Sequence, residues 1–265
     1  MMMAFFSRDE RGFVAGDFAV SKWSPDHVAG PAICGLLARE LETHCPGSGF
    51  VPARLTADLF RPVRNEPITV HSAVVRSGTR VRVADAWITQ QDEVRVRASV
   101  MYLAVAQQPP GRIWQAEQSL PVPDRRLDAP TGQPPLFKCG DGDWSGDFAA
   151  AQNEERKSVW QNLPPLVEGE PITPFQRAAF LADTTNLVCH WGTEGVGYIN
   201  SDVTLTLTRL PAGRELGLHA QDHISADGIA VGTATLYDRT GRIGTCVVTA
   251  LADAARQVDM AETRV

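Results

Sequence analysis

One stretch of this chain occurs twice and decides its fold. It reads LTADLFRPVRNEPITVHSAVVRSG at residues 55–78 and VTLTLTRLPAGRELGLHAQDHISA at residues 203–226. With a shift of 148 residues, 55–102 and 203–250 align without a gap. The identical pairs are Thr56/Thr204, Leu59/Leu207, Arg61/Arg209, His71/His219, Ser77/Ser225, Val83/Val231, Ala86/Ala234 and Val100/Val248. The chain therefore contains two copies of one structural unit.

The pattern inside each copy is that of β-strands. Apolar and polar residues alternate over 55–60, 94–100 and 203–208, which is the period-two signature of a half-buried strand. Turn signals separate these runs, among them Ser77-Gly78 and Asp227-Gly228. We therefore expect each copy to form antiparallel hairpins with one face covered.

Each copy also contains one predicted helix ahead of its strands. The first helix is expected over 32–43, with Pro31 in its first turn. The second is expected from Phe175 to about His190, after Thr173 as N-cap and Pro174 as first helical residue. The same shift of 148 places Gly35 of the first helix opposite Asp183 of the second.

These elements divide the chain into three parts. Residues 1–106 form an N-terminal repeat and 148–265 a C-terminal repeat. The segment 107–147 between them is rich in proline, which predicts an extended connector.

Composition excludes several classes of function. The 265 residues carry a formal net charge of −6, which argues against non-specific binding to nucleic acid. No apolar stretch is long enough to cross a membrane, and no secretory signal is evident. The five cysteines are scattered without metal-ligand spacing, so we expect reduced thiols, a cytoplasmic location and no metal.

Four segments carry a resemblance to a known family. They are WSPDHVAGPAICGLLARELE (23–42), PARLTADLFRPV (52–63), FLADTTNLVCHWGTEGVGYINSDVTLTLTRLP (180–211) and GTATLYDRTGRIGTC (232–246). Their order and spacing are similar to those of TesB-like acyl-CoA thioesterases, in particular the actinobacterial thioesterase-like branch. The resemblance implies an α+β tandem (double) hotdog fold, with two long helices each wrapped by a curved antiparallel sheet. It also implies an acyl-CoA substrate, no cofactor apart from the CoA of that substrate, and a homo-oligomer, expected to be a dimer.

The resemblance also implies three catalytic positions. In the family, an Asp on the second helix, a Thr or Ser at the next strand and a Gln on the last strand hold the hydrolytic water. These positions correspond here to Asp183, Asn200 and, within one residue of register, Thr249. Asp183 lies in a mostly apolar run, where a carboxylate is costly unless it is paired, so such a residue is more often functional than a surface acid is. The sequence departs from the family at the other two positions.

The turn before the first helix is the predicted site for the oxyanion. His27 and Gly30 lie there, and backbone N–H groups at a helix N-terminus can bind an anion. Because Gly35 takes the place of Asp183 in the first copy, we expect one site per chain.

Two alternatives remain open on sequence grounds. Asp183, Asn186 and His190 share one helix face, which is similar to hotdog enoyl hydratases and dehydratases, although the spacing differs. This function would need His27 or His190 within hydrogen-bond reach of Asp183. If the protein is not a hydratase, we interpret His190 as a positively charged residue at the helix C-terminus, where it suits the helix dipole. The third hypothesis is a non-catalytic acyl- or CoA-binding protein, which the departure at Thr249 favours.

Overall fold

The computed structural model describes residues 3–115, 119–127 and 134–262. The helices are η1 (Asp17–Ala19), α1 (Gly30–Glu42), α2 (Phe148–Ala151), α3 (Pro174–Asp183) and α4 (Thr185–His190). The strands of the N-terminal half are β1 (Phe6–Asp9), β2 (Gly12–Ala15), β3 (Phe50–Leu59), β4 (Val70–Ser77), β5 (Val81–Gln90) and β6 (Glu93–Ala104). Those that follow are β7 (Leu136–Cys139), β8 (Lys157–Asn162), β9 (Trp191–Gly192), β10 (Gly195–Val196), β11 (Tyr198–Asn200), β12 (Asp202–Leu207), β13 (Glu215–Ala226), β14 (Ile229–Asp238) and β15 (Gly241–Ala252).

One antiparallel sheet joins the two halves of the chain. Its strand order is β4-β5-β6-β3-β12-β15-β14-β13-β8-β7, and β11 also pairs with β15. The halves meet where β3 pairs with β12, and Thr56 lies directly opposite Thr204. Their side-chain hydroxyl oxygens are 3.1 Å apart. Because these two residues are equivalent in the repeat, the approximate twofold axis between the copies passes through this pair.

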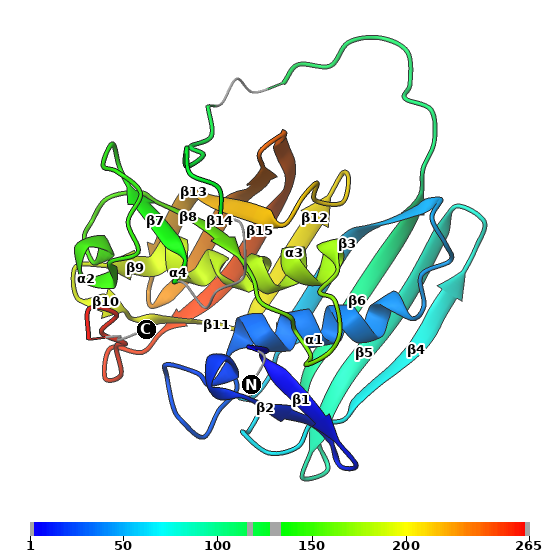
Figure 1. The fold of residues 1–265 in the computed structure, drawn as a ribbon, viewed down its shortest axis with the longest axis horizontal. Helices are drawn as coiled ribbons and strands as arrows, with labels where there is room; N and C mark the ends of the chain where they lie inside the picture. Colours follow the sequence, from blue (N-terminus) through cyan, green and yellow to red (C-terminus); the bar gives the residue numbers. More distant parts are fainter. Residues whose placement is uncertain (1–2, 116–118, 128–133, 263–265) are drawn as a thin grey trace.

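α1 and α3 lie side by side on one face of this sheet (Figure 1). α1 and α3 are antiparallel, since the end of α1 contacts the start of α3. There Glu42 accepts hydrogen bonds from the Thr173 hydroxyl and the Gln176 amide, both at 2.7 Å. Thr173 and Gln176 also form a capping box, as expected for this helix start. The opposite end of the pair brings the start of α1 to Asp183.

The second helix is broken, which corrects the prediction of one helix to His190. α3 ends at Asp183 and α4 begins at Thr185. Residues 183–186 read Asp-Thr-Thr-Asn, and these residue types are weak helix formers because their short polar side chains compete for backbone groups. The Asn186 amide donates to the Tyr198 carbonyl at 2.9 Å, which ties this break to β11.

The connector is shorter than the sequence suggested. Strand β7 lies inside 107–147 and pairs with β8, so the chain rejoins the sheet from Leu136 onward. The reason is packing: the Phe137 side chain is 2% exposed and contacts the rings of Phe148 and Trp191. The proline content of this segment concealed the strand.

The seam between the halves is filled by apolar side chains. Leu55 on β3 and Leu205 on β12 are directly opposite each other and are 1% and 0% exposed. Directly opposed side chains on one sheet face are in contact. The two halves therefore share their core at this point.

We predict that Leu55→Ala and Leu205→Ala each lower the free energy of unfolding by about 2–5 kcal/mol, because each leaves a cavity. The double variant should lose less than the sum by about 0.5 kcal/mol or more, because the two cavities merge. Urea unfolding of the single and double variants measures this coupling. Leu210→Ala, at a residue that is 38% exposed, is the control and should cost less than about 1 kcal/mol. Strictly additive losses would contradict a shared core at the seam.

Candidate active site

The centre of the site is the buried carboxylate of Asp183 at the end of α3. This residue is 5% exposed. Its Oδ1 accepts a hydrogen bond from the Asn200 amide at 2.9 Å and lies 3.9 Å from the Cys34 thiol. Among the described residues, both hydrogen bonds donated to this carboxylate therefore go to Oδ1. Oδ2 lies toward Gly30.

Gly30 allows this close approach because it has no side chain. A Cβ atom built on Gly30 would lie 2.5 Å from Asp183 Oδ2, well inside van der Waals contact. Gly30 is the first residue of α1, where helical geometry gives the N–H no intrahelical acceptor. The positive end of the α1 dipole thus faces the carboxylate.

Burial and hydrogen bonding act on Asp183 in opposite directions. Burial raises the pKa of Asp183 to about 6, and the hydrogen bond from Asn200 works against that rise. The Cys34 thiol stays protonated, because burial and the neighbouring Asp183 charge raise its pKa well above the usual value. A carboxylate whose pKa lies near neutral pH is suited to accept a proton from water.

The structure brings Asn200 to Asp183 but not Thr249. A β-bulge separates them: β11 pairs Asn200 with Ala250, whereas β12 pairs Thr204 with Val247, a shift of one residue. Thr249 is exposed, and its side chain contacts Ser201 and Asp202. Its neighbour Ala250 is the residue opposite Asn200.

Ala250 therefore takes the place next to Asn200 that sequence alignment gave to Thr249. Directly opposed residues in an antiparallel pair project to the same face of the sheet, and Ala250 is 3% exposed. A methyl group there cannot hold a water molecule. The one-residue uncertainty in register thus decided which residue lies beside Asn200. No feature of the sequence predicts the bulge at Ser201.

Cys34 is the contact that the sequence did not indicate. It lies one helical turn after Gly30 and is completely buried. The spacing of four residues on a helix could have placed it on the same face as Gly30. Scattered cysteines carry no such signal by themselves.

The turn at His27 offers fewer free N–H groups than the sequence suggested. Its backbone N–H donates to the Ser24 carbonyl at 3.2 Å and is not available to an oxyanion. The N–H groups of Val28 and Ala29 are also used, by Val63 and Ala19 respectively. Gly30 is thus the first residue in this run whose N–H donates to no other described residue.

His190 is buried and neutral, which corrects its interpretation as a cation at a helix end. It is 7% exposed, and burial, together with the adjacent His223, lowers its pKa to about 4. Its Nδ1 lies 2.8 Å from Asn186 Oδ1. Because the Asn186 amide nitrogen donates to Tyr198, its oxygen faces His190, so Nδ1 donates and Nε2 holds the lone pair. Within the described ranges neither His190 nor His27 hydrogen-bonds to Asp183, which the hydratase hypothesis required.

The described part of the chain gives no candidate metal centre. No group of three or more His, Cys, Asp or Glu side chains there could hold a metal ion. None of its helices has both the length and the apolar character needed to cross a membrane.

The comparison with protein families fits this geometry. Residues 19–103 match the acyl-CoA thioesterase N-terminal domain, and residues 116–252 match the acyl-CoA thioesterase C-terminal domain. The two domains together define a thioester hydrolase. The chain belongs to the acyl-CoA thioesterase family, which confirms the TesB-like resemblance. A search of curated proteins gave no match.

Solved structures show the same fold at low sequence identity. A tesB protein of Mycobacterium avium subsp. paratuberculosis is 16% identical, with a TM-score of 0.65 over 94% of this chain and 96% of that one. Acyl-CoA thioesterase II TesB2 of Mycobacterium marinum is 14% identical, with a TM-score of 0.62 over 84% and 90%. A hot dog fold protein of unknown function from Alicyclobacillus acidocaldarius is 15% identical, with a TM-score of 0.65 over 94% and 96%. The expected α+β double hotdog fold is confirmed.

We predict that Gly30→Ala lowers the free energy of unfolding by about 1–3 kcal/mol, because the new methyl group overlaps the Asp183 carboxylate. This loss outweighs the gain of about 0.4–1 kcal/mol that alanine brings by restricting the unfolded chain. The control is Gly49→Ala, since no atom lies within 4 Å of a Cβ at Gly49. Thermal unfolding compares the two. Equal stability of the two variants would contradict the close contact between Gly30 and Asp183.

The raised pKa of Asp183 predicts a pH dependence of stability. The fold raises this pKa from 3.8 to about 6, so the folded state binds the proton more tightly than the unfolded state. The contribution of Asp183 to the free energy of unfolding is therefore fully present below about pH 4. It is lost as the pH rises through about 6, by about 3 kcal/mol in total. Relative to wild type, Asp183→Asn should gain stability between pH 4 and pH 7. Urea unfolding at both pH values measures the difference, and parallel curves would contradict burial of the charged carboxylate.

Proposed function

We propose that this protein hydrolyses an acyl-CoA thioester, with Asp183 as the general base. The observation that carries the proposal is a buried carboxylate, raised in pKa, that touches the first residue of a helix from the other half of the chain. A base and a donor for the carbonyl oxygen are the two groups that thioester hydrolysis requires. The two halves supply one each.

In the proposed mechanism, Asp183 takes a proton from water while the water oxygen bonds to the thioester carbon. The carbonyl electrons move to the oxygen, and the Gly30 N–H at the start of α1 stabilises this oxyanion. When the tetrahedral intermediate collapses, the carbon–sulfur bond breaks. The thiolate then receives the proton held by Asp183, and the products are a carboxylic acid and free CoA.

Asn200 is proposed to orient the base. Its amide donates to Asp183 Oδ1, which leaves Oδ2 on the side of Gly30 for the proton transfer. With Ala250 beside Asn200, the water has fewer polar partners than the sequence resemblance implied. The acyl or CoA binder without turnover is thus the alternative outcome of the experiment below.

We predict that Asp183→Asn lowers kcat/KM for acyl-CoA by about 100-fold or more, the usual range for loss of a general base. Asn200→Ala should cost about 10–100-fold, because it removes a hydrogen bond to a charged group. Release of free thiol from a panel of acyl-CoAs of increasing chain length measures both. In the wild type, kcat/KM should rise with pH through about 6, where Asp183 loses its proton.

The matched control is Thr249→Val. Its exposed hydroxyl contacts Asp202 and Ser201, so its loss should change kcat/KM by less than about twofold. Unchanged thiol release in Asp183→Asn would refute the mechanism. Binding of CoA without any thiol release would favour the binding protein.

A further inference from the structure

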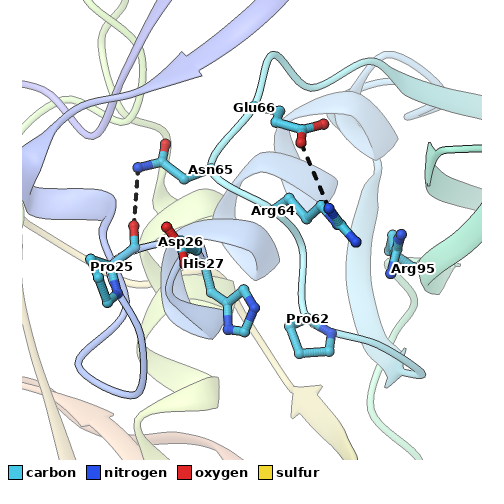
Figure 2. Close-up of a pocket in the computed structure, with 8 residues that line it drawn as sticks. All are labelled: Pro25, Asp26, His27, Pro62, Arg64, Asn65, Glu66 and Arg95. Atoms are coloured by element: carbon cyan, nitrogen blue, oxygen red, sulfur yellow. Dashed lines mark hydrogen bonds and ion pairs between the residues drawn. The ribbon is translucent and has the colours of Figure 1, made fainter.

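A separate hollow lies beside the start of α1. Its volume is about 530 Å³, and its walls include His27, Arg64 and Arg95 (Figure 2). Asp26 and Glu66 also line it. His27 precedes Gly30 by three residues, so the backbone at the hollow lies within about 11 Å of the backbone at Gly30.

The two arginines of this hollow form longer ion pairs than Arg209 and Arg239 do. Arg209 meets Asp238 through two contacts of 2.7 and 2.9 Å, and Arg239 meets Glu215 at 2.5 Å. In contrast, Arg64 is 4.0 Å from Glu66, and Arg95 is 3.6 Å from Glu93. Arg95 also donates to the Gln91 side-chain oxygen at 3.4 Å. Contacts this long leave most of the guanidinium hydrogen-bonding capacity unused.

Arg95 is the more unusual of the two. It is 6% exposed, and its Nε has no hydrogen-bond partner among the described residues. Burial of a cationic nitrogen without a partner is costly. In Figure 2 the Arg64 side chain extends toward Arg95, and Glu66 lies on its other side. Two positive groups that converge on one hollow fit an anion between them.

The backbone holds this arrangement in place. The Gln90 side chain accepts from the Arg64 N–H at 2.9 Å and donates to the Arg64 carbonyl at 3.1 Å. The Asn65 N–H donates to the Asp26 carbonyl at 2.8 Å, and Arg61 N–H donates to the Arg95 carbonyl at 3.0 Å. The three segments that form the walls are thus fixed to one another before any ligand binds.

We propose that Arg64 and Arg95 form a phosphate-binding subsite for the thiol-bearing part of the substrate. This inference rests on the proposed function, since a thioester of pantetheine brings a phosphate within reach of a catalytic centre. The ligand chemistry is a phosphoester on a pantetheine arm. Two sources share it: CoA itself, and the phosphopantetheine group of an acyl carrier protein.

The experiment is calorimetric titration of the full-length protein with CoA, dephospho-CoA, 4′-phosphopantetheine and pantetheine. Arg64→Gln and Arg95→Gln should weaken binding of CoA by about 10–100-fold, the usual loss for a hydrogen-bonded charge. Binding of pantetheine should not change. An equal loss for 4′-phosphopantetheine assigns the site to the phosphate next to pantetheine, which carrier proteins share. A loss for CoA, without one for dephospho-CoA or 4′-phosphopantetheine, would place the arginines at the ribose 3′-phosphate and would overturn a subsite for the phosphate of the pantetheine arm.

Arg80→Gln is the matched control. Arg80 is exposed and precedes β5, whereas Gln90, which holds Arg64, ends that strand. Arg80→Gln thus removes the same positive charge at the far end of the strand, about 30 Å from Gln90. Because Arg95 is buried, circular dichroism and thermal unfolding establish whether Arg95→Gln folds; Arg64, whose side chain is 46% exposed, tests the site without that risk.

The outcomes separate this proposal from the proposed function. Weaker CoA binding in Arg64→Gln, in a protein that releases no thiol, would support the subsite and overturn the hydrolase. Normal KM and CoA affinity in both arginine variants, with thiol release intact, would overturn the subsite and leave the hydrolase standing. Losses equal to those of Arg80→Gln would also overturn it, because they would report net charge alone.

Discussion

The pairing of β3 with β12 is the constraint on which the rest of this structure depends. It joins two sheets into one and places Thr56 opposite Thr204, its own equivalent in the repeat. A twofold axis at that point relates the helices of the two halves, so these helices lie antiparallel on the same face of the sheet. The start of α1 then meets the end of α3, and Gly30 contacts Asp183. The contact between Gly30 and Asp183 is therefore a consequence of strand register about the seam.

A nearly symmetric scaffold gives an asymmetric site because the two copies differ at the position of the carboxylate. Gly35 occupies the place that Asp183 has in the second copy. A Cβ there would already touch Leu166 and approach Phe180, so the equivalent space is apolar and filled. A second carboxylate would be buried without a partner, which costs several kcal/mol. One half thus supplies the acid and the other supplies a helix N-terminus, and neither half contains a complete site.

The surroundings of Asp183 follow from local features of two strands. The bulge at Ser201 turns Asp202 and Thr249 to the exposed face and leaves Ala250 beside Asn200. The carboxylate is held by one amide at 2.9 Å and a distant thiol, with the helix dipole of α1 as its remaining stabilisation. So few donors cannot offset burial, and for this reason the pKa of Asp183 stays above its usual value.

The sequence by itself determined the repeat, the strand alternation and both helix starts, because each depends on local periodicity. Through the family resemblance it also indicated Asp183 as the candidate acid, a carboxylate in a mostly apolar run. It also placed Gly30 near the predicted site, because backbone N–H groups at a helix N-terminus can bind an anion. The strand inside the connector, the bulge at Ser201 and the neutral state of His190 were decided only by tertiary structure. The break at Thr184 was decided by a tertiary contact acting on a segment of weak helix formers. Each of these depends on segments distant in the sequence: Tyr198 for the helix break, β8 for the connector strand and β15 for the bulge. For His190 the cause is burial, together with the neighbouring His223. A periodic pattern carries no information about such contacts, since they arise from packing between segments and not from the order of residues within one.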